Sequence, residues 1–210
     1  MSSPWLEVPL EDYEGHMLSP EVAQLPVLAD LFAEALASRR PASVAVLGVA
    51  GGNGLDRIDP ALTKRVVGID CNPIFLGAVR GRYAGLAGLE VHCVDLAREM
   101  VEAEPVNLVH AALVFEHAGT GLCLENAVRM VDAGGALSVV LQLPSEQAVS
   151  PSAYASIQML RSNFVYVEPG ELRAALELRG LLLERESRRD LPEGKAFWAG
   201  IFTRFGHGNA

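Results

Sequence analysis

The stretch Val44-Ala-Val-Leu-Gly-Val-Ala-Gly-Gly-Asn-Gly54 decides the fold of this chain. Its first half is a short apolar run, rich in valine, of the kind found in strands that are buried on both faces of a parallel sheet. Its second half turns into glycines around a single asparagine. A buried strand that runs directly into such a turn leaves backbone N–H groups uncovered at the carboxyl edge of the sheet. We therefore predict a binding site for a polar ligand at this edge.

The composition limits the size and the surroundings of the protein. A chain of 210 residues, half of them hydrophobic, fits one domain with room for a small appendage. No apolar run approaches the roughly 18 residues that a membrane span needs, and the N-terminus shows no signal segment. The cysteines at 71, 93 and 123 have wide spacings that predict neither disulfides nor a metal site. We expect a cytoplasmic protein without a bound metal, and a monomer or a homodimer.

The charge balance argues against a nucleic-acid partner. The chain carries 17 lysine and arginine residues against 26 aspartate and glutamate residues, which gives a formal net charge of −9. A general nucleic-acid binder would present a basic face to the phosphates. We expect no nucleic-acid partner and no membrane partner.

Residues 1–42 are predicted to form a helical arm before the first strand. Residues 1–18 read as irregular, and Ser19-Pro20-Glu21 has the serine cap, proline and acid that begin a helix. Apolar residues follow at helical spacing as far as Leu36, with a kink or a break expected at Pro26. Two interpretations remain open: the arm packs on the sheet as an amphipathic helix, or its Tyr13-to-Met17 segment forms a lid over the ligand.

Strands and helices alternate over residues 43–206, the predicted main domain. Such alternation is typical of a parallel sheet with helices on both faces. After the first strand we predict strands at 65–70, 89–95, 106–115 and 136–143. The intervening helices are predicted after Asp59-Pro60 and at 72–83, 96–102 and 122–131, the last ended by Gly134-Gly135.

The last third of the chain changes character. Helices are predicted at 152–160 and around Leu172–Leu178, followed by strands at 181–189 and 196–205. The short connection Leu191-Pro-Glu-Gly-Lys195 makes that last pair antiparallel. Residues 207–210 are predicted to be a frayed tail.

The spacing of the glycines distinguishes between ligands. A dinucleotide fold would place G-x-G-x-x-G after the first strand, and no such pattern occurs here. The available spacing, small-x-G-x-G from Ala50 to Gly54, resembles the first motif of class I S-adenosylmethionine-dependent methyltransferases. The resemblance covers residues 44–205. It includes strands that end on Asp70 and Asp95, the Phe115-Glu116-His117 end of the fourth strand, Gly134-Gly135, and Lys195-Ala-Phe197 at the last turn.

The resemblance implies an α/β, Rossmann-like fold with a seven-stranded, mostly parallel sheet, helices on both faces and a C-terminal antiparallel strand pair. It implies S-adenosyl-L-methionine as cofactor and S-adenosyl-L-homocysteine as product. Asp70 would accept both ribose hydroxyls, and Asp95 with the Leu96 N–H would bind the adenine. The implied cofactor-binding residues are Gly48, Val49, Ala50, Gly51, Asn53, Asp70, Cys71, Asn72, Asp95, Leu96, Val114 and Phe115.

The chain departs from the family pattern at two positions. Gly48 stands where the family has an acid that helps to hold the methionine ammonium, and Ala50 replaces the first glycine of the motif. Tyr13, Glu14 or a backbone carbonyl would have to hold the ammonium instead.

The implied activity is methyl transfer to a small molecule. The methyl group would move by in-line displacement to an O, N, C or S nucleophile. The sulfonium is already a good leaving group, so proximity and orientation carry most of the catalysis, and a base is needed only if the acceptor must lose a proton. His117 is the candidate catalytic residue. The candidate substrate and lid residues are Tyr13, His16, Met17, Glu116, Gln142 and Tyr154.

Each site residue also has a structural interpretation, and the function has alternatives. Asp70 could be only a cap for the helix that begins at Pro73, Glu116 a partnered carboxylate, and His117 a satisfied histidine. A protein of this fold could bind the cofactor or a nucleoside without transferring a methyl group. An atypical NAD-dependent oxidoreductase is less consistent with the glycine spacing. The Asn-Pro-Pro-Tyr or Asp-Pro-Pro-Tyr tetrapeptide of DNA and glutamine N-methyltransferases is missing after the fourth strand, where Val114-Phe-Glu-His stands.

Overall fold

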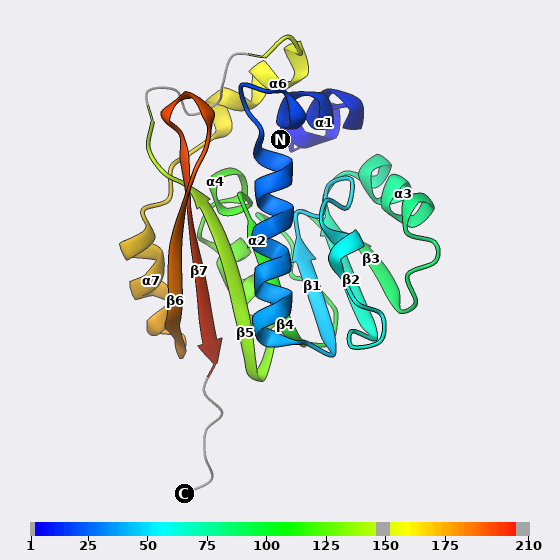
Figure 1. The fold of residues 1–210 in the computed structure, drawn as a ribbon, viewed down its shortest axis with the longest axis vertical. Helices are drawn as coiled ribbons and strands as arrows, with labels where there is room; N and C mark the ends of the chain where they lie inside the picture. The colour runs from blue at the N-terminus through cyan, green and yellow to red at the C-terminus, as the bar shows by residue number, and fades with distance from the viewer. Residues whose placement is uncertain (1–2, 146–151, 205–210) are drawn as a thin grey trace, which may run out of the picture.

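A computed structural model describes residues 3–145 and 152–204, which form one α/β unit around a seven-stranded sheet (Figure 1). The strands are β1 Ser43–Leu47, β2 Arg65–Asp70, β3 Leu89–Cys93, β4 Val106–Ala112, β5 Val131–Gln142, β6 Leu181–Asp190 and β7 Ala196–Arg204. The helices are α1 Leu10–Leu18, α2 Gln24–Arg39, α3 Pro73–Arg82, α4 Phe115–Ala118, α5 Leu122–Arg129, α6 Ala155–Met159 and α7 Pro169–Glu177. The predicted tail at 207–210 lies outside the described residues.

The sheet confirms the predicted topology. Its strand order is β3-β2-β1-β4-β5-β7-β6, and the first five strands pair in parallel. Strand β7 is antiparallel to both of its neighbours, β5 and β6. The strand order reverses between β1 and β4: β2 and β3 follow β1 on one side, and β5 follows β4 on the other. The carboxyl ends of β1 and β4 therefore flank the crevice where open α/β sheets bind ligands.

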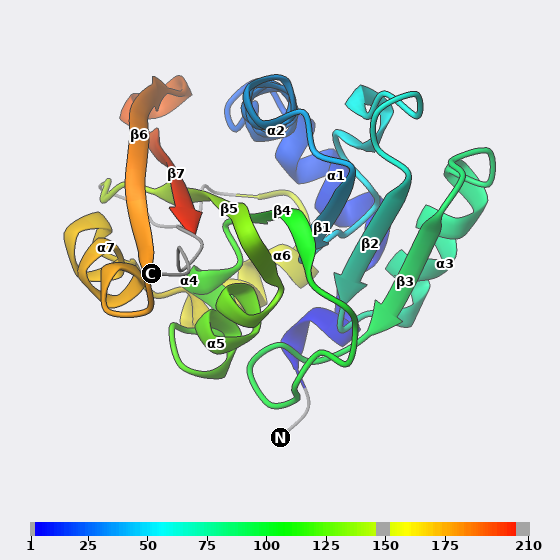
Figure 2. The same ribbon diagram turned by 90° about the horizontal axis from the view of Figure 1, so that it is seen from below.

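Helices cover the two faces of the sheet (Figure 2). On one face α2 and α3 bury a cluster around Phe32, Leu76 and Val79 against β1 and β2. On the other face α5 and α7 bury Leu124 and Leu176, among others, against β4, β5 and β7. Because both faces are buried, the central strands carry continuous apolar runs, which is why they were recognisable in the sequence. No helix in the described ranges is long and apolar enough to cross a membrane.

The N-terminal arm differs from its prediction. Residues 10–18, predicted to be irregular, form α1, and the predicted helix start at Ser19 lies in a turn. Helix α2 begins at Gln24, after Ala23 in a left-handed conformation. Pro26 is therefore the third residue of α2 and neither kinks nor divides it, because the first-turn N–H groups of a helix have no intrahelical partner to lose.

Several loop regions were also predicted wrongly. Residues 96–102 form a turn instead of a helix, residues 59–62 form a turn held by the Asp59 carbonyl, and Gly134-Gly135 lies inside β5. Strand β4 ends at Ala112, three residues early, because Leu113 adopts φ +55° and the chain enters α4. The conformation of Leu113 turns the residues after β4 back over the edge of the sheet, where the site forms.

Asn126 fixes the turn that follows β3. Its side chain is fully buried in α5, and its Oδ1 accepts the Val101 N–H at 2.9 Å. Its Nδ2 donates to the Glu99 carbonyl at 2.8 Å and to the Leu96 carbonyl at 3.4 Å. A single side chain thus adds three hydrogen bonds to this segment, beside those that the Arg98 and Glu99 N–H groups donate to the Asp95 carbonyl.

Glu116 ties α4 to the end of β5. Its Oε1 accepts the Gln142 N–H at 2.8 Å, while Oε2 is buried with no hydrogen-bond partner in the described structure. Only 1% of the residue is exposed, and burial raises the pKa of Glu116 to about 7.

We predict that Asn126→Ala lowers the free energy of unfolding by about 2–4 kcal/mol, because buried backbone groups lose their only side-chain partner. Urea denaturation measures this difference. The exposed Arg129→Ala on the same helix is the control and should change stability little. Equal stability of the two variants would show that water satisfies the Leu96–Val101 turn.

We predict that Glu116→Gln becomes more stable relative to the wild type as pH rises. The folded-state pKa lies above the usual value of 4.5, so the wild type loses about 3 kcal/mol of stability between pH 4.5 and 7, and glutamine does not titrate. Urea denaturation at pH 5 and pH 8 measures the change. Glu171→Gln, at an exposed position of α7, is the control. A stability difference between Glu116→Gln and the wild type that is the same at both pH values would contradict a raised pKa of Glu116.

Candidate functional site

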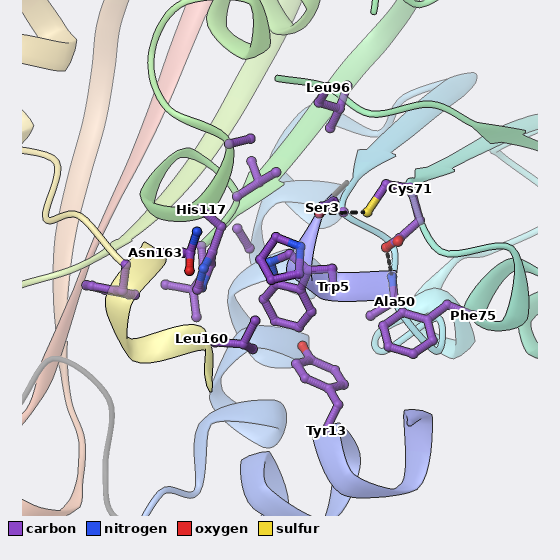
Figure 3. A pocket seen from close by; sticks show the side chains of 18 of the residues that line it. Ser3, Trp5, Tyr13, Ala50, Cys71, Phe75, Leu96, His117, Leu160 and Asn163 are labelled. Carbon is purple, nitrogen blue, oxygen red and sulfur yellow. Dashed lines mark hydrogen bonds between the residues drawn. The ribbon is translucent and has the colours of Figure 1, made fainter. Parts of the chain in front are cut away.

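A cavity of about 270 Å³ lies at the carboxyl edge of the parallel strands, under the N-terminal arm (Figure 3). Its walls come from the turn after β1, the ends of β2 to β5, α1, the start of α2, α4 and the segment after α6. The structure thus brings together side chains that are up to 192 residues apart in the sequence, from Ser3 to Lys195. The predicted site residues that line it are Tyr13, His16, Met17, Gly48, Ala50, Asp70, Cys71, Asp95, Leu96, Val114, His117 and Gln142.

Seven predicted site residues do not line this cavity, and most have a structural contact instead. Val49 packs in the core under α2 and α3, and Phe115 packs in the core on the opposite face. Asn53 donates to the Leu25 carbonyl at 2.9 Å and so fastens the glycine turn to α2. Tyr154 packs against Gly15 of α1.

The other three belong to the surroundings of the cavity. Gly51 accepts a hydrogen bond from Arg82 at 3.2 Å and leaves no room for a side chain beside Glu14. Asn72 caps α3 by accepting the Ile74 N–H at 2.9 Å. Glu116 belongs to α4, and its carboxylate accepts the Gln142 N–H at 2.8 Å.

The N–H groups at 48–50, in the turn after β1, are hydrogen-bonded within the protein, so the prediction that they are uncovered is wrong. Gly48 and Val49 both donate to the Ile69 carbonyl, at 2.8 and 3.0 Å, and Ala50 donates to Asp70 at 2.9 Å. Gly48 has φ +68° and Ala50 has φ +45°, so the backbone folds back onto β2. The turn therefore offers a close, small-residue surface to a ligand rather than an array of free donors.

Asp70 is held between the two first strands. Its Oδ2 accepts the Ala50 N–H and its Oδ1 accepts the Asn72 N–H, both at 2.9 Å. Burial raises the pKa of Asp70, and these backbone hydrogen bonds oppose that rise. Asn72, not Asp70, is the side-chain cap of α3, so the capping interpretation of Asp70 is wrong. Asp70 lines the cavity, and a carboxylate in this place suits a ligand with two hydroxyl groups.

Cys71 and the turn after β3 form the wall of the cavity next to Asp70. Cys71 is partly buried, its Sγ lies 3.6 Å from Ser3 Oγ, and burial raises its pKa to about 11, so the thiol is not a nucleophile at neutral pH. Asp95 accepts the Ala97 N–H at 3.1 Å and forms an ion pair with Arg98. Asp70 and Asp95 are the carboxylates that line the cavity within the described ranges.

The N-terminal segment enters the cavity, and the sequence did not predict this. Trp5 lies in the middle of the view in Figure 3, between His117 and Ala50. Its ring makes edge contacts with His117 at 4.9 Å and with Tyr13 at 5.9 Å. Asn72 holds the segment in place by donating to the Trp5 carbonyl at 2.9 Å. A tryptophan in an otherwise acidic segment was the only signal in the sequence.

His117 has an apolar, aromatic environment. Its ring lies at the edges of Trp5 and Phe164, at centroid distances of 4.9 and 5.3 Å. Burial lowers its pKa to about 4, so the ring is neutral at pH 7. Its Nδ1 is buried without a hydrogen-bond partner among the described residues. A neutral imidazole in this position is able to accept or donate one hydrogen bond to a ligand.

Glu14 does not take the place of the missing acid at Gly48. Its carboxylate forms a two-point ion pair with Arg82, and it does not line the cavity. Tyr13 does line the cavity, and burial raises the pKa of its hydroxyl, which stays protonated. Of the three candidates for the ammonium, the Tyr13 hydroxyl and backbone carbonyl groups remain.

The lining also contains residues that were not predicted as site residues. They come mostly from the N-terminal arm, the turn after β3 and the segment after α6, where no motif marks them. They are Ser3, Pro4, Trp5, Val22, Gln24, Leu28, Phe75, Val94, Ala97, Arg98, Ala112, Leu113, Ala118, Ile157, Leu160, Asn163, Phe164 and Lys195.

Comparison with known proteins gives matches of structure and not of sequence. No protein-family model matches the chain, and no curated protein sequence matches it. The structure is similar to the N-methyltransferase NodS from Bradyrhizobium japonicum in complex with S-adenosyl-L-homocysteine, at TM-score 0.71 and 18% identity, over 95% of this chain and 96% of that one.

Two further solved structures show the range of the neighbours. The 1,6-didemethyltoxoflavin-N1-methyltransferase from Burkholderia thailandensis, with S-adenosylhomocysteine bound, matches at TM-score 0.66 and 12% identity, over 98% of this chain and 92% of that one. The [4+2]-cyclase SpnF matches at TM-score 0.65 and 12% identity, over 86% and 81%. The structural neighbours are mostly class I S-adenosylmethionine-dependent methyltransferases of small molecules, and this chain has their fold.

Proposed function

We propose that this protein is an S-adenosylmethionine-dependent methyltransferase that acts on a small molecule. The observation that carries the proposal is the position of Asp70, which is buried at the end of β2, is fixed by two backbone N–H groups and lines the cavity. A carboxylate in this place suits two vicinal hydroxyls of a ribose and repels an added ribose phosphate. The fold shared with proteins that bind S-adenosylhomocysteine supports the same cofactor.

The lining residues fit the parts of the cofactor in order. Asp70 would hold the ribose, and Cys71, Asp95 and Leu96 would surround the adenine. The methionine part would lie on Gly48 and Ala50, with Val114 beside the sulfonium. Of the two carboxylates that line this part of the cavity in the described residues, Asp95 forms an ion pair with Arg98, so Asp70 is the one whose charge favours a sulfonium cation. When bound, the cofactor supplies an activated methyl group.

The chain's own contribution is then mostly orientation. The walls exclude water and hold the acceptor in line with the transferred group, which is the main source of rate when the leaving group is already good. We propose that His117, which lines the cavity, touches the acceptor with its ring. With a pKa of about 4 it is a weak base, so it suits a hydrogen bond that orients the acceptor better than it suits removal of a proton.

The arrangement of the chain supports two further parts of the proposal. Residues 1–42 act as an arm that covers the cavity, and residues 43–206 form the binding domain, since Trp5 and Tyr13 lie over the site that the strands build. The cysteines at 71, 93 and 123 are unpaired, which agrees with a reducing, cytoplasmic location. The acidic net charge favours a small-molecule acceptor over a nucleic acid.

A second candidate is a protein that binds the cofactor without transferring its methyl group. The absence of an acid at Gly48, and of Glu14 from the cavity, favours it, and SpnF shows that a cyclase also has this fold. Formation of S-adenosylhomocysteine with any member of a panel of phenol, amine, carboxylate and thiol acceptors would exclude this candidate. Binding without turnover on the whole panel would favour it.

We predict that Asp70→Ala weakens the binding of S-adenosylhomocysteine by one to a few kcal/mol, the usual cost of losing charge-assisted hydrogen bonds. Isothermal titration calorimetry measures the affinity. Asp132→Ala is the control, because Asp132 is exposed at the start of β5, on the opposite edge of the sheet. Unchanged affinity in Asp70→Ala would show that Asp70 does not bind the ribose of the ligand. If the protein binds NAD at micromolar concentration and does not bind S-adenosylhomocysteine, the proposed function is wrong.

We predict that S-adenosylhomocysteine changes the tryptophan fluorescence, because Trp5 lies in the cavity and must rearrange or contact the ligand. The chain has two tryptophans, and Trp198 is buried in β7 with its Nε1 donating to Glu186 at 2.8 Å. The change should persist in Trp198→Phe and disappear in Trp5→Phe. A ligand-dependent change that survives in Trp5→Phe would show that the segment at Pro4–Glu7 does not cover the site.

A further inference from the structure

The first described residues of the chain lie along the wall that the proposed cofactor would contact. The Cys71 thiol lies 3.6 Å from the Ser3 hydroxyl oxygen, so Ser3 covers the wall assigned above to the adenine. Two residues later the Trp5 carbonyl accepts the Asn72 amide at 2.9 Å. Residues 3–5 therefore run past the end of β2, next to the place proposed for the nucleoside.

The Trp5 side chain lies across the cavity. In Figure 3 it lies between Ala50, in the turn after β1, and His117, in α4. The centroids of the Trp5 and His117 rings are 4.9 Å apart, with the ring planes at 85°. The proposed function places the methionine part of the cofactor at Ala50 and the acceptor at His117. Trp5 thus lies where the two reactants would have to meet.

The space beside this segment is too small for both reactants. The cavity measures about 270 Å³ with residues 3–5 among its walls. Pockets that enclose a single drug-sized ligand measure roughly 300–1,000 Å³. Methyl transfer needs a cofactor and an acceptor in contact with each other. Part of the wall therefore has to move before both are bound.

Residues 3–7 are a weakly held part of the wall. None of them is buried, whereas Val8 and Leu10 are buried in a core cluster. The strand ends that form the opposite wall carry residues of the main core. Val8 and Pro9 are extended and separate the short helix Pro4–Glu7 from α1. Residues 3–7 can therefore leave the cavity while α1 stays folded on the sheet.

We propose that residues 3–7 are a plug that inhibits this site: Trp5 occupies the place where cofactor and acceptor meet, and the two bind only after the segment leaves. This inference rests on the proposed function, because the places of the two reactants come from it. A plug differs from a cover in its effect on binding. A plug competes with the ligand and lowers its affinity, whereas a cover contacts the ligand and raises its affinity.

The contacts of the plug indicate the size of its effect. The plug is held by one hydrogen bond from a neutral amide and by ring contacts of Trp5 with His117 and Tyr13. The cost of ordering the segment opposes these contacts. The minor state of such an equilibrium is populated at up to about 10%. Because the apparent affinity falls with the fraction of open molecules, we expect about a tenfold effect (about 1.4 kcal/mol).

Isothermal titration calorimetry of the full chain with S-adenosylhomocysteine measures this effect. Trp5→Ala should bind about tenfold more tightly than the wild type, because the ring no longer competes. Trp5→Phe keeps a ring in the same place and should stay close to the wild type. Leu6→Ala is the control, because Leu6 is exposed on the same short helix and does not line the cavity. Equal or weaker binding by Trp5→Ala would overturn the inference.

A second measurement does not depend on the folding of Trp5→Ala. In Trp198→Phe the sequence keeps one tryptophan, Trp5, so acrylamide quenching of the fluorescence reports the exposure of Trp5. S-adenosylhomocysteine should raise the quenching constant, because the ligand drives Trp5 out into solvent. A quenching constant that falls or stays the same when the ligand binds would show that Trp5 covers the ligand, and would overturn the inference.

The outcomes separate this inference from the proposed function. If neither the wild type nor any variant binds S-adenosylhomocysteine, the proposed function is wrong, and the inference is wrong with it. If the wild type binds S-adenosylhomocysteine and Trp5→Ala does not bind it more tightly, the proposed function stands and the plug alone is wrong.

Discussion

The carboxylate of Asp70 is the contact on which the rest of the site depends. It joins the turn after β1 to the turn after β2 through the Ala50 and Asn72 N–H groups. Without it, two buried backbone donors at the reversal point of the sheet would have no partner, which is costly in a region shielded from water. The site is therefore rigid where the strands end, and the position of Asp70 is set by the fold before any ligand arrives.

The N-terminal arm completes the cavity through contacts of a different kind. Asn72 caps α3 with its carbonyl oxygen and holds the Trp5 backbone with its amide, so one side chain links the sheet edge to the arm. Trp5, Tyr13 and Phe75 form a chain of ring contacts across the arm and α3. Arg82 and Glu14 add an ion pair at the rim. The arm is thus fastened at several points along its length rather than at a single hinge.

The sequence predicted the sheet better than it predicted the site. Strands β1, β2 and β5 are buried on both faces, so their apolar runs are plain, and the carboxylate at Asp70 follows directly from the end of such a run. Helix α1 was missed because its residues show no clear period. The turn at 96–101 resembles the start of a helix, since the Arg98 and Glu99 N–H groups donate to the Asp95 carbonyl, but Asn126, 25 to 30 residues away, holds the rest of its backbone. Trp5, Gln24 and Lys195 could not be placed in the cavity because no local pattern records which distant segments meet above a sheet edge. Only tertiary packing brings them together.

The cavity has two kinds of wall, and this has a consequence for how such a protein changes over time. The half around Asp70 is made by strand ends, whose positions are constrained by the core beneath them. The wall around Lys195 is made by α1, the start of α2 and a hairpin turn, which bury an apolar cluster of their own around Met17, Val22, Leu28 and Leu191. Mutations can therefore remodel one wall while the other keeps its geometry. Exchange of the arm and the hairpin between proteins of this fold offers a practical route to new ligand specificity on an unchanged scaffold.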